Sequence, residues 1–138
     1  MDHADSTIVA TLREAMPDLV AVYRFGSTAS GESHGRSDVD VAYLSRPGLR
    51  HALDARDRFD LQGRLGVALH RDVDLVDLAA ASTVLRMQVI GRGLLLAEFD
   101  ATERELFEDY VFSSYARLNE ERRGILERVQ REGRVYDG

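Results

Sequence analysis

The N-terminal part of the chain passes from helical spacing of apolar residues to a short apolar run. Residues at three- and four-residue intervals define one helix face, which consists of Ile8, Val9, Leu12, Ala15 and Met16. Ser6 is a suitable N-cap for this helix, and Pro17 is expected to end it. Residues 19–25 then combine β-branched and aromatic side chains and stop at Gly26, which predicts a strand.

The middle of the chain continues this alternation of helical and extended patterns. Residues 26–37 are rich in Gly, Ser and Thr, which is the composition of a loop. The pattern after this loop predicts strands over residues 39–44, 73–78 and 94–96, and helices over residues 49–66 and 79–90. Helices that alternate with strands are typical of the α/β class.

One long helical pattern fills the C-terminal part of the sequence, from about residue 102 to residue 131. Its apolar stripe consists of Phe107, Val111, Leu118, Ile125 and Val129. This stripe is longer than the core of one small domain covers, and its second half mixes arginine with glutamate, so it is a candidate surface for a protein partner. No repeat or linker interrupts the sequence, and residues 1–138 are therefore interpreted as a single domain.

Composition removes several classes of protein from consideration. A chain of 138 residues with 44% hydrophobic content is able to bury one core. It contains 0 cysteines, which excludes disulfides and thiolate metal sites. The net charge of −6 argues against direct, sequence-independent nucleic-acid binding, which needs clustered positive charge. A polar, acidic N-terminus and short apolar runs predict neither a signal peptide nor a membrane span, so a cytoplasmic location is expected.

The loop after the first predicted strand begins with Gly26 and Ser27, and this pair is the first candidate for chemistry. Glycine lets the backbone turn sharply and approach a ligand closely. Ser27 offers a hydroxyl and a backbone N–H, and the following turn aims further N–H groups at the same point. The pair therefore predicts an anion site of the kind that suits the terminal phosphates of a nucleotide.

Two carboxylates follow at the start of the next predicted strand. Asp38 and Asp40 are two positions apart, so their side chains leave the same face of the strand. These like charges repel each other, and a divalent cation that prefers oxygen ligands, such as Mg²⁺, relieves the repulsion. A third carboxylate is expected from an adjacent strand, and Asp74 is preferred because it lies in the middle of one. Asp72 at the entry of that strand and Asp77, which faces the other way, remain alternatives.

The order of these parts resembles a known signature. Gly26-Ser27, ten intervening residues and then Asp38-Val39-Asp40 is similar to the motif of nucleotidyltransferases of the DNA polymerase beta superfamily. The short chain resembles the minimal nucleotidyltransferase (MNT) type, which includes the antitoxins of HEPN/MNT toxin–antitoxin systems. The resemblance covers nearly the whole chain.

The sequence departs from the family pattern at one place. Many relatives carry arginine shortly after the Gly-Ser pair, just before the next glycine, whereas this chain has Ser30 before Gly31. Arg36 and Arg24 are the candidates to make the corresponding phosphate contact instead.

The resemblance implies both a fold and a reaction. The fold is that of a minimal nucleotidyltransferase, a small mixed sheet flanked by helices with a long C-terminal helix. Asp38, Asp40 and Asp74 are implied to hold two Mg²⁺ ions, and Gly26 and Ser27 to bind the phosphates of ATP. The implied reaction transfers AMP from ATP to a tyrosine hydroxyl of a cognate HEPN RNase toxin and neutralises that toxin.

Two other functions fit the same residues. Enzymes of this fold also act on small hydroxylated molecules, as aminoglycoside nucleotidyltransferases do, although such enzymes usually add a domain that forms the acceptor pocket. A non-catalytic antitoxin that acts by binding alone has no need of the carboxylates, and the intact set of three argues against it. The sequence leaves both alternatives open.

Overall fold

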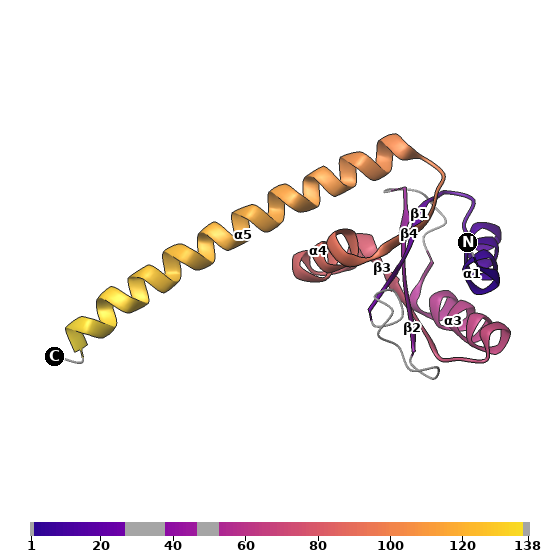
Figure 1. The fold of residues 1–138 in the computed structure, drawn as a ribbon, viewed down its shortest axis with the longest axis horizontal. Helices are drawn as coiled ribbons and strands as arrows, with labels where there is room; N and C mark the ends of the chain where they lie inside the picture. Colours follow the sequence, from indigo (N-terminus) through magenta and orange to yellow (C-terminus); the bar gives the residue numbers. More distant parts are fainter. Residues whose placement is uncertain (1, 27–37, 47–52, 137–138) are drawn as a thin grey trace.

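A computed structural model of the chain describes residues 2–26, 38–46 and 53–136 (Figure 1). The elements in chain order are α1 (His3–Ala15), β1 (Leu19–Phe25), β2 (Val39–Ser45), α3 (Ala55–Leu69), β3 (Val73–Asp77), the short 3-10 helix η1 (Leu78–Ala80), α4 (Thr83–Arg92), β4 (Leu94–Glu98) and α5 (Ala101–Tyr136). The predicted α/β class is confirmed.

The strands form one mixed sheet in the order β3-β2-β1-β4. β1 pairs antiparallel with β2 and with β4, whereas β2 and β3 run parallel. The C-terminal end of β1 and the N-terminal ends of β2 and β3 therefore lie side by side at the same end of the sheet. Helices α1 and α3 cover one face, and α4 and α5 lie on the other (Figure 1). The mixed sheet flanked by helices that the resemblance implied is confirmed.

Both faces of the sheet are buried against helices, because alternate residues of each strand point to opposite faces. On β2, Val41 and Tyr43 pack with α1 and α3, and Ala42 and Leu44 pack on the opposite face. The first core also holds Ile8, Leu12, Leu61 and Leu65. The second core also holds Val20, Tyr23, Leu78 and Val89, with Phe107 of α5 packed against it.

The first helix and strand lie close to their predicted positions. Strand β1 has the predicted bounds of 19–25, and α1 ends at Ala15, before Pro17, as predicted. The predicted cap at Ser6 is wrong, because α1 begins at His3 and Asp2 is its N-cap. The Asp2 carboxylate accepts a hydrogen bond from the backbone N–H of Asp5 at 2.8 Å, which satisfies one of the unpaired donors of the first turn.

Two later helices start after their predicted first residues. Helix α3 starts at Ala55 instead of residue 49, because the carboxylate of Asp54 accepts from the N–H of Asp57 and caps it. Residues 49–52 of that prediction lie outside the described residues. Helix α4 starts at Thr83 instead of residue 79, and Ser82 is its N-cap. In both cases a capping side chain inside the predicted helix fixes the true start.

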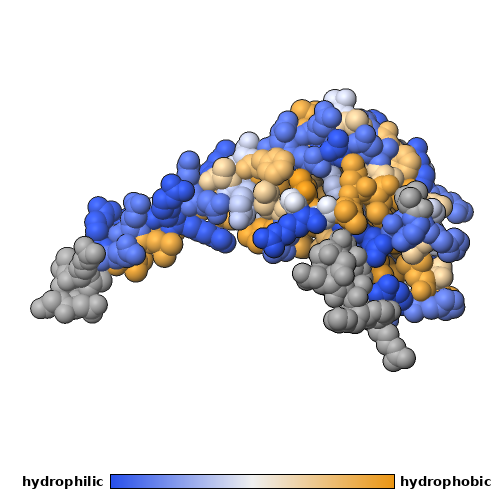
Figure 2. Space-filling model, in the orientation of Figure 1, coloured by the Kyte–Doolittle hydropathy of each residue, from blue (hydrophilic) through white to orange (hydrophobic). Residues whose placement is uncertain are grey.

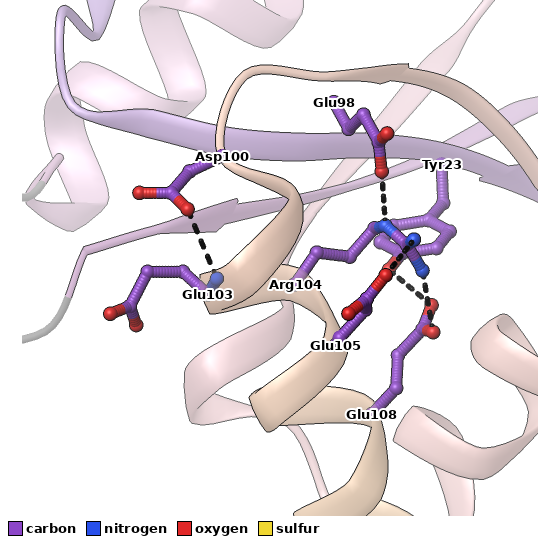
Figure 3. Close-up of polar contacts among 7 residues, drawn as sticks. All are labelled: Tyr23, Glu98, Asp100, Glu103, Arg104, Glu105 and Glu108. Atoms are coloured by element: carbon purple, nitrogen blue, oxygen red, sulfur yellow. Dashed lines mark hydrogen bonds and ion pairs between the residues drawn. The ribbon is translucent and has the colours of Figure 1, made fainter.

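Polar contacts fasten the first turns of α5 to the sheet (Figure 3). Arg104 donates to Glu98 of β4 at 2.5 Å and to Glu108 one turn further along α5 at 2.7 Å. The Tyr23 hydroxyl of β1 donates to Glu108 at 2.8 Å, and burial is the main cause that raises the pKa of this phenol. Asp100 caps α5 by accepting from the N–H of Glu103 at 3.1 Å. The helix therefore leaves the sheet in a fixed direction.

Beyond these first turns α5 projects away from the rest of the molecule (Figure 1). Val111 is fully buried, but Ile125, Leu126 and Val129 are 51%, 62% and 58% exposed. Figure 2 shows apolar side chains exposed among hydrophilic ones along this projecting part. The prediction that the apolar stripe of this helix extends beyond the core is confirmed. Among the described residues, neither α5 nor any other helix is both long and apolar enough to cross a membrane.

Candidate active site

Gly26 forms the turn that ends β1, and the structure explains why this position has no side chain. Its φ angle is +76°, a conformation that glycine adopts at no steric cost. A Cβ atom at this position would lie 2.2 Å from Oδ2 of Asp40. The Asp40 carboxylate therefore occupies the space beside the Gly26 backbone. Ser27, the other predicted phosphate-binding residue, lies outside the described residues.

The parallel pairing of β2 with β3 brings two of the predicted carboxylates together. Asp40 is directly in register with Asp74, and neighbouring strands lie about 4.8 Å apart. Both residues share strand parity with residues of the second core, such as Ala42 on β2 and Val76 on β3, so both face the α4 side of the sheet. Asp38 lies one residue before β2 and has the parity of Asp40. The three candidate carboxylates thus lie at the same end of β2 and β3 and on the same face of the sheet.

The negative charges of Asp38 and Asp74 act on the carboxyl group of Asp40. Asp40 is half-buried, whereas Asp38 and Asp74 are exposed. The pKa of the Asp40 carboxyl is raised above its ordinary value, first by burial and then by the negative charges of Asp74 and Asp38. Such a site gains stability when a cation neutralises it.

The donor chemistry of this cluster fits a hard divalent cation, because all of its donors are carboxylate oxygens. In the described parts of the chain, no three His, Cys, Asp or Glu side chains stand close enough to enclose an ion as placed. Mutual repulsion keeps like charges apart, so closing the set around one point requires a cation. The carboxylates are thus suited to bind a metal ion but are not preformed as a closed cage.

The two alternatives for the third carboxylate occupy different positions. Asp72 precedes β3, is exposed, and accepts the N–H of Val39 through its backbone carbonyl at 2.8 Å. The Asp77 carboxylate accepts the N–H of Ala79 at 3.1 Å and its charge acts on Tyr43 in the α1–α3 core. Asp77 therefore faces away from the cluster. Asp74 is the strand residue whose charge acts on Asp40.

The structure gives Arg24 a different role from the phosphate contact considered above. Its guanidinium donates to the carboxylate of Asp5 on α1 at 2.7 Å, and both side chains are only 13% exposed. Arg24 pairs with Val41, so it lies on the α1–α3 face, opposite the carboxylate cluster. The suggestion that Arg24 contacts phosphate is therefore wrong. Arg36, the other candidate, lies outside the described residues.

An open groove of about 950 Å³ runs from the carboxylates along α3, and we call it the α3 groove. Its described lining includes Asp38, Phe59, Gly63, Val67, His70 and Asp74. The helical pattern predicted over residues 49–66 did not indicate this groove, because the buried face of α3 is formed by Leu61 and Leu65. A second stripe at four-residue intervals, Phe59, Gly63 and Val67, was the available signal.

The sequence matches the family described as polymerase beta, nucleotidyltransferase over residues 6–102. A curated relative, the protein adenylyltransferase MntA of Shewanella oneidensis, is 39% identical over 125 residues, which make up 91% of this chain and 86% of that protein. The region that matches the family, residues 6–102, contains the whole sheet and the three candidate carboxylates.

Solved structures of similar proteins also match this chain in fold. A crystal structure of a toxin–antitoxin with AMP-PNP superposes with a TM-score of 0.78 at 39% identity, covering 91% of this chain and 98% of that one. A structure of tri-AMPylated Shewanella oneidensis HEPN toxin in complex with MNT antitoxin gives a TM-score of 0.72 at 36% identity, covering 92% of this chain and 96% of that one. The chain therefore belongs to the polymerase beta nucleotidyltransferase family, and within it to the minimal nucleotidyltransferases that include MntA.

Proposed function

We propose that this chain is an antitoxin-type protein adenylyltransferase that transfers AMP from ATP to a tyrosine hydroxyl of a HEPN toxin partner. The observation that carries the proposal is the in-register pair of Asp40 and Asp74 beside the Gly26 turn, with Asp38 next to them. The relatives support the choice of substrates. MntA is named a protein adenylyltransferase, and similar structures contain AMP-PNP or an AMPylated HEPN toxin with its MNT antitoxin.

Asp38, Asp40 and Asp74 are the residues that would hold Mg²⁺, and we propose two ions. Bound there, the ions would neutralise the triphosphate and lower the pKa of the attacking hydroxyl. Gly26 and Ser27 would hold the phosphates, with Gly26 leaving the backbone open to close approach. Asp74 is exposed and lines the α3 groove, so its carboxylate is able to accept the proton of an incoming hydroxyl.

The proposed reaction is a single displacement at the α-phosphorus of ATP. The acceptor oxygen forms a bond to this phosphorus while the bond to the bridging oxygen of the β-phosphate breaks. The electron pair leaves with pyrophosphate, and the hydroxyl proton passes to a carboxylate or to solvent. The contribution of the protein is mainly to position the reactants and to balance their charge.

The proposal is tested by incubating the purified chain with α-labelled ATP, Mg²⁺ and a HEPN toxin partner. We expect the label to appear on a tyrosine of the partner and pyrophosphate to be released. Label on an added aminoglycoside, but not on the partner, would instead favour a small-molecule nucleotidyltransferase. Absence of label on either acceptor would contradict the proposal.

Without metal, the stability of the protein should depend on the ionisation of Asp40 and therefore on pH. The folded-state pKa of Asp40 is raised, so its contribution to stability is fully present below the unfolded value of about 3.8 and is lost as pH rises through the folded value. At neutral pH and without metal, Asp40→Asn should therefore raise the melting temperature. This advantage should shrink as the pH falls through the raised folded-state pKa of Asp40 and should be gone below about 3.8.

Mg²⁺ should stabilise the wild type more than the Asp40→Asn variant. At about ten times its dissociation constant, a bound ion stabilises the native state by about 1.4 kcal/mol, so the wild type should melt at a higher temperature. The Asn variant should respond much less. Differential scanning calorimetry with and without Mg²⁺ measures both quantities, and an equal response of the two proteins would place the ion elsewhere.

The projecting half of α5 is proposed to bind the toxin partner. Truncation after Glu120 keeps Phe107 and Val111, which pack against the body, and removes the exposed Ile125 and Val129. We therefore expect the truncated protein to keep its fold and its binding of ATP, and to associate more weakly with the partner. Pull-down and calorimetric titration against the HEPN toxin provide the measurement. Undiminished complex formation would show that this half of the helix is not the docking surface.

A further inference from the structure

We infer that the α3 groove receives the acceptor segment of the protein substrate, and that Phe59, Gly63 and Val67 contact its aromatic side chain. The inference rests on the proposed function. The inference specifies where on the protein the acceptor lies and which residues select the acceptor. The groove runs along α3, on the opposite face of the sheet from α4, and reaches Asp38 and Asp74 beside the edge strand β3. An acceptor that lies in the groove therefore extends past this edge to bring its hydroxyl to the two carboxylates.

The order of the strands indicates the direction from which the acceptor approaches. The Gly26 turn lies at the end of β1, the carboxylates lie on β2 and β3, and β3 is an edge strand. In a displacement at phosphorus, the attacking and leaving oxygens are roughly in line on opposite sides. If the terminal phosphates occupy the Gly26 turn, pyrophosphate leaves on the β1 side. The acceptor oxygen must then enter from the β3 side, where the groove lies.

The α3 wall of the groove has the shape and polarity that an aromatic side chain needs. Phe59 and Val67 are 72% and 76% exposed, although both are large apolar residues. Gly63 lies between them, one helical turn from each, and no atom lies within 4 Å of the position that its Cβ would take. Residues four apart share one helix face, so the glycine leaves a gap between two apolar side chains.

The other end of the groove is acidic, and this restricts the acceptor further. Asp38, Asp72 and Asp74 line it together with Arg71 and His70. Within this described lining the three carboxylates outnumber the one guanidinium, and the negative potential disfavours anionic acceptors such as carboxylates and phosphates. A phenol is neutral at physiological pH and combines an apolar ring with a reactive oxygen at its tip. The groove therefore fits a tyrosine within a neutral or basic segment, with the ring on the α3 wall and the hydroxyl at the carboxylates.

A larger side chain at Gly63, on the α3 wall of the groove, tests this assignment. A Cβ at Gly63 would have no atom within 4 Å, and leucine has a better helix propensity than glycine, so the Gly63→Leu variant should fold. We expect its KM for the HEPN toxin acceptor to rise at least about 10-fold, the scale of steric misfit in an apolar pocket. Its affinity for Mg²⁺-ATP, measured by calorimetry, should stay unchanged. Ala68→Leu is the matched control, because Ala68 is exposed on α3 but is not part of the described lining.

A second measurement locates the acceptor directly and does not depend on turnover. A photoreactive benzoyl-phenylalanine in place of Phe59 should cross-link to the partner peptide that carries the AMP-accepting tyrosine, whereas the same group in place of Phe112 on α5 should not. Cross-links from position 59 only to other peptides would overturn the inference. Loss of Mg²⁺-ATP affinity in Gly63→Leu would also overturn it, because the groove would then hold the nucleotide.

Different results would contradict the proposed function and the assignment of the groove. If the wild-type chain transfers no AMP to the partner, the proposed function fails. If the wild type transfers AMP and Gly63→Leu does so with an unchanged KM, the proposed function stands and the assignment of the groove is wrong.

Discussion

Asp40→Asn should abolish transfer of AMP, with a loss of more than about 100-fold, while the protein stays folded. Loss of a residue that only orients a metal ligand costs about 10- to 100-fold, and Asp40 is proposed as a ligand itself. It stands at the centre of the cluster, in register with Asp74 and against the Gly26 turn. The amide keeps the size of the carboxyl group but removes the negative charge that attracts the cation. Asp38→Asn should have a similar effect.

The fold should tolerate this change, because the ionised Asp40 carboxylate is destabilised by burial and by two neighbouring negative charges. Transfer from labelled ATP is measured together with thermal melting. Asp60→Asn is the matched control, since Asp60 is an exposed carboxylate on α3 that is not part of the described groove lining. Transfer at the wild-type rate by either cluster variant would refute the metal-site assignment. Neutralisation of the toxin by a variant that transfers no AMP would favour the antitoxin that acts by binding alone.

The carboxylate cluster could be predicted from the sequence because strand parity is a local property. Asp38 and Asp40 are two positions apart and share a face of their strand, whereas Asp74 and Asp77 are three positions apart and point to opposite faces of the sheet. What the sequence could not provide was the register between β2 and β3, which places Asp74 directly beside Asp40. Register depends on how the two strands pack with the helices, and no residue in either strand encodes it alone.

The elements with two clear boundaries were predicted best. Strand β1 stands between Pro17 and Gly26, and both residues stop regular structure for steric reasons. The helix starts were predicted less well, because the chain offers competing caps. Asp2 and Ser6 are both good N-caps, and nothing local decides which residue ends up at the start of the helix.

The parts of the site that were missed depend on contacts between distant segments. Arg24 lies next to the Gly26 turn in sequence. Its guanidinium forms an ion pair with the carboxylate of Asp5, nineteen residues earlier, on the other face of the sheet. The Phe59–Val67 stripe becomes part of the site because α3 packs beside β3, at the edge that carries Asp74. Both facts follow from tertiary packing, which a single sequence without its fold does not supply.

Gly26→Val should remove ATP binding, because the position has no room for a side chain and no suitable conformation for one. The valine Cβ would lie 2.2 Å from Oδ2 and 3.2 Å from Cγ of Asp40, so the Asp40 carboxylate would have to move away from its partners. The φ angle of +76° would add roughly 1–2 kcal/mol of backbone strain for any residue with a Cβ, and more for a β-branched one. The substitution therefore disturbs the proposed phosphate turn and the proposed metal ligand together.

Calorimetric titration with Mg²⁺ and a non-hydrolysable ATP analogue separates this effect from general loss of the fold. The wild type should bind the analogue, and Gly26→Val should bind it at least about 100-fold more weakly, because a misplaced ligand is expected to cost at least as much as a lost orienting contact. Gly124→Val is the matched control, since no atom lies within 4 Å of a Cβ placed at Gly124 and this residue belongs to the half of α5 beyond Glu120. That variant should bind the analogue like the wild type. Equal affinity of Gly26→Val and the wild type would show that the nucleotide does not use this turn, and the direction of approach inferred for the acceptor would lose its basis.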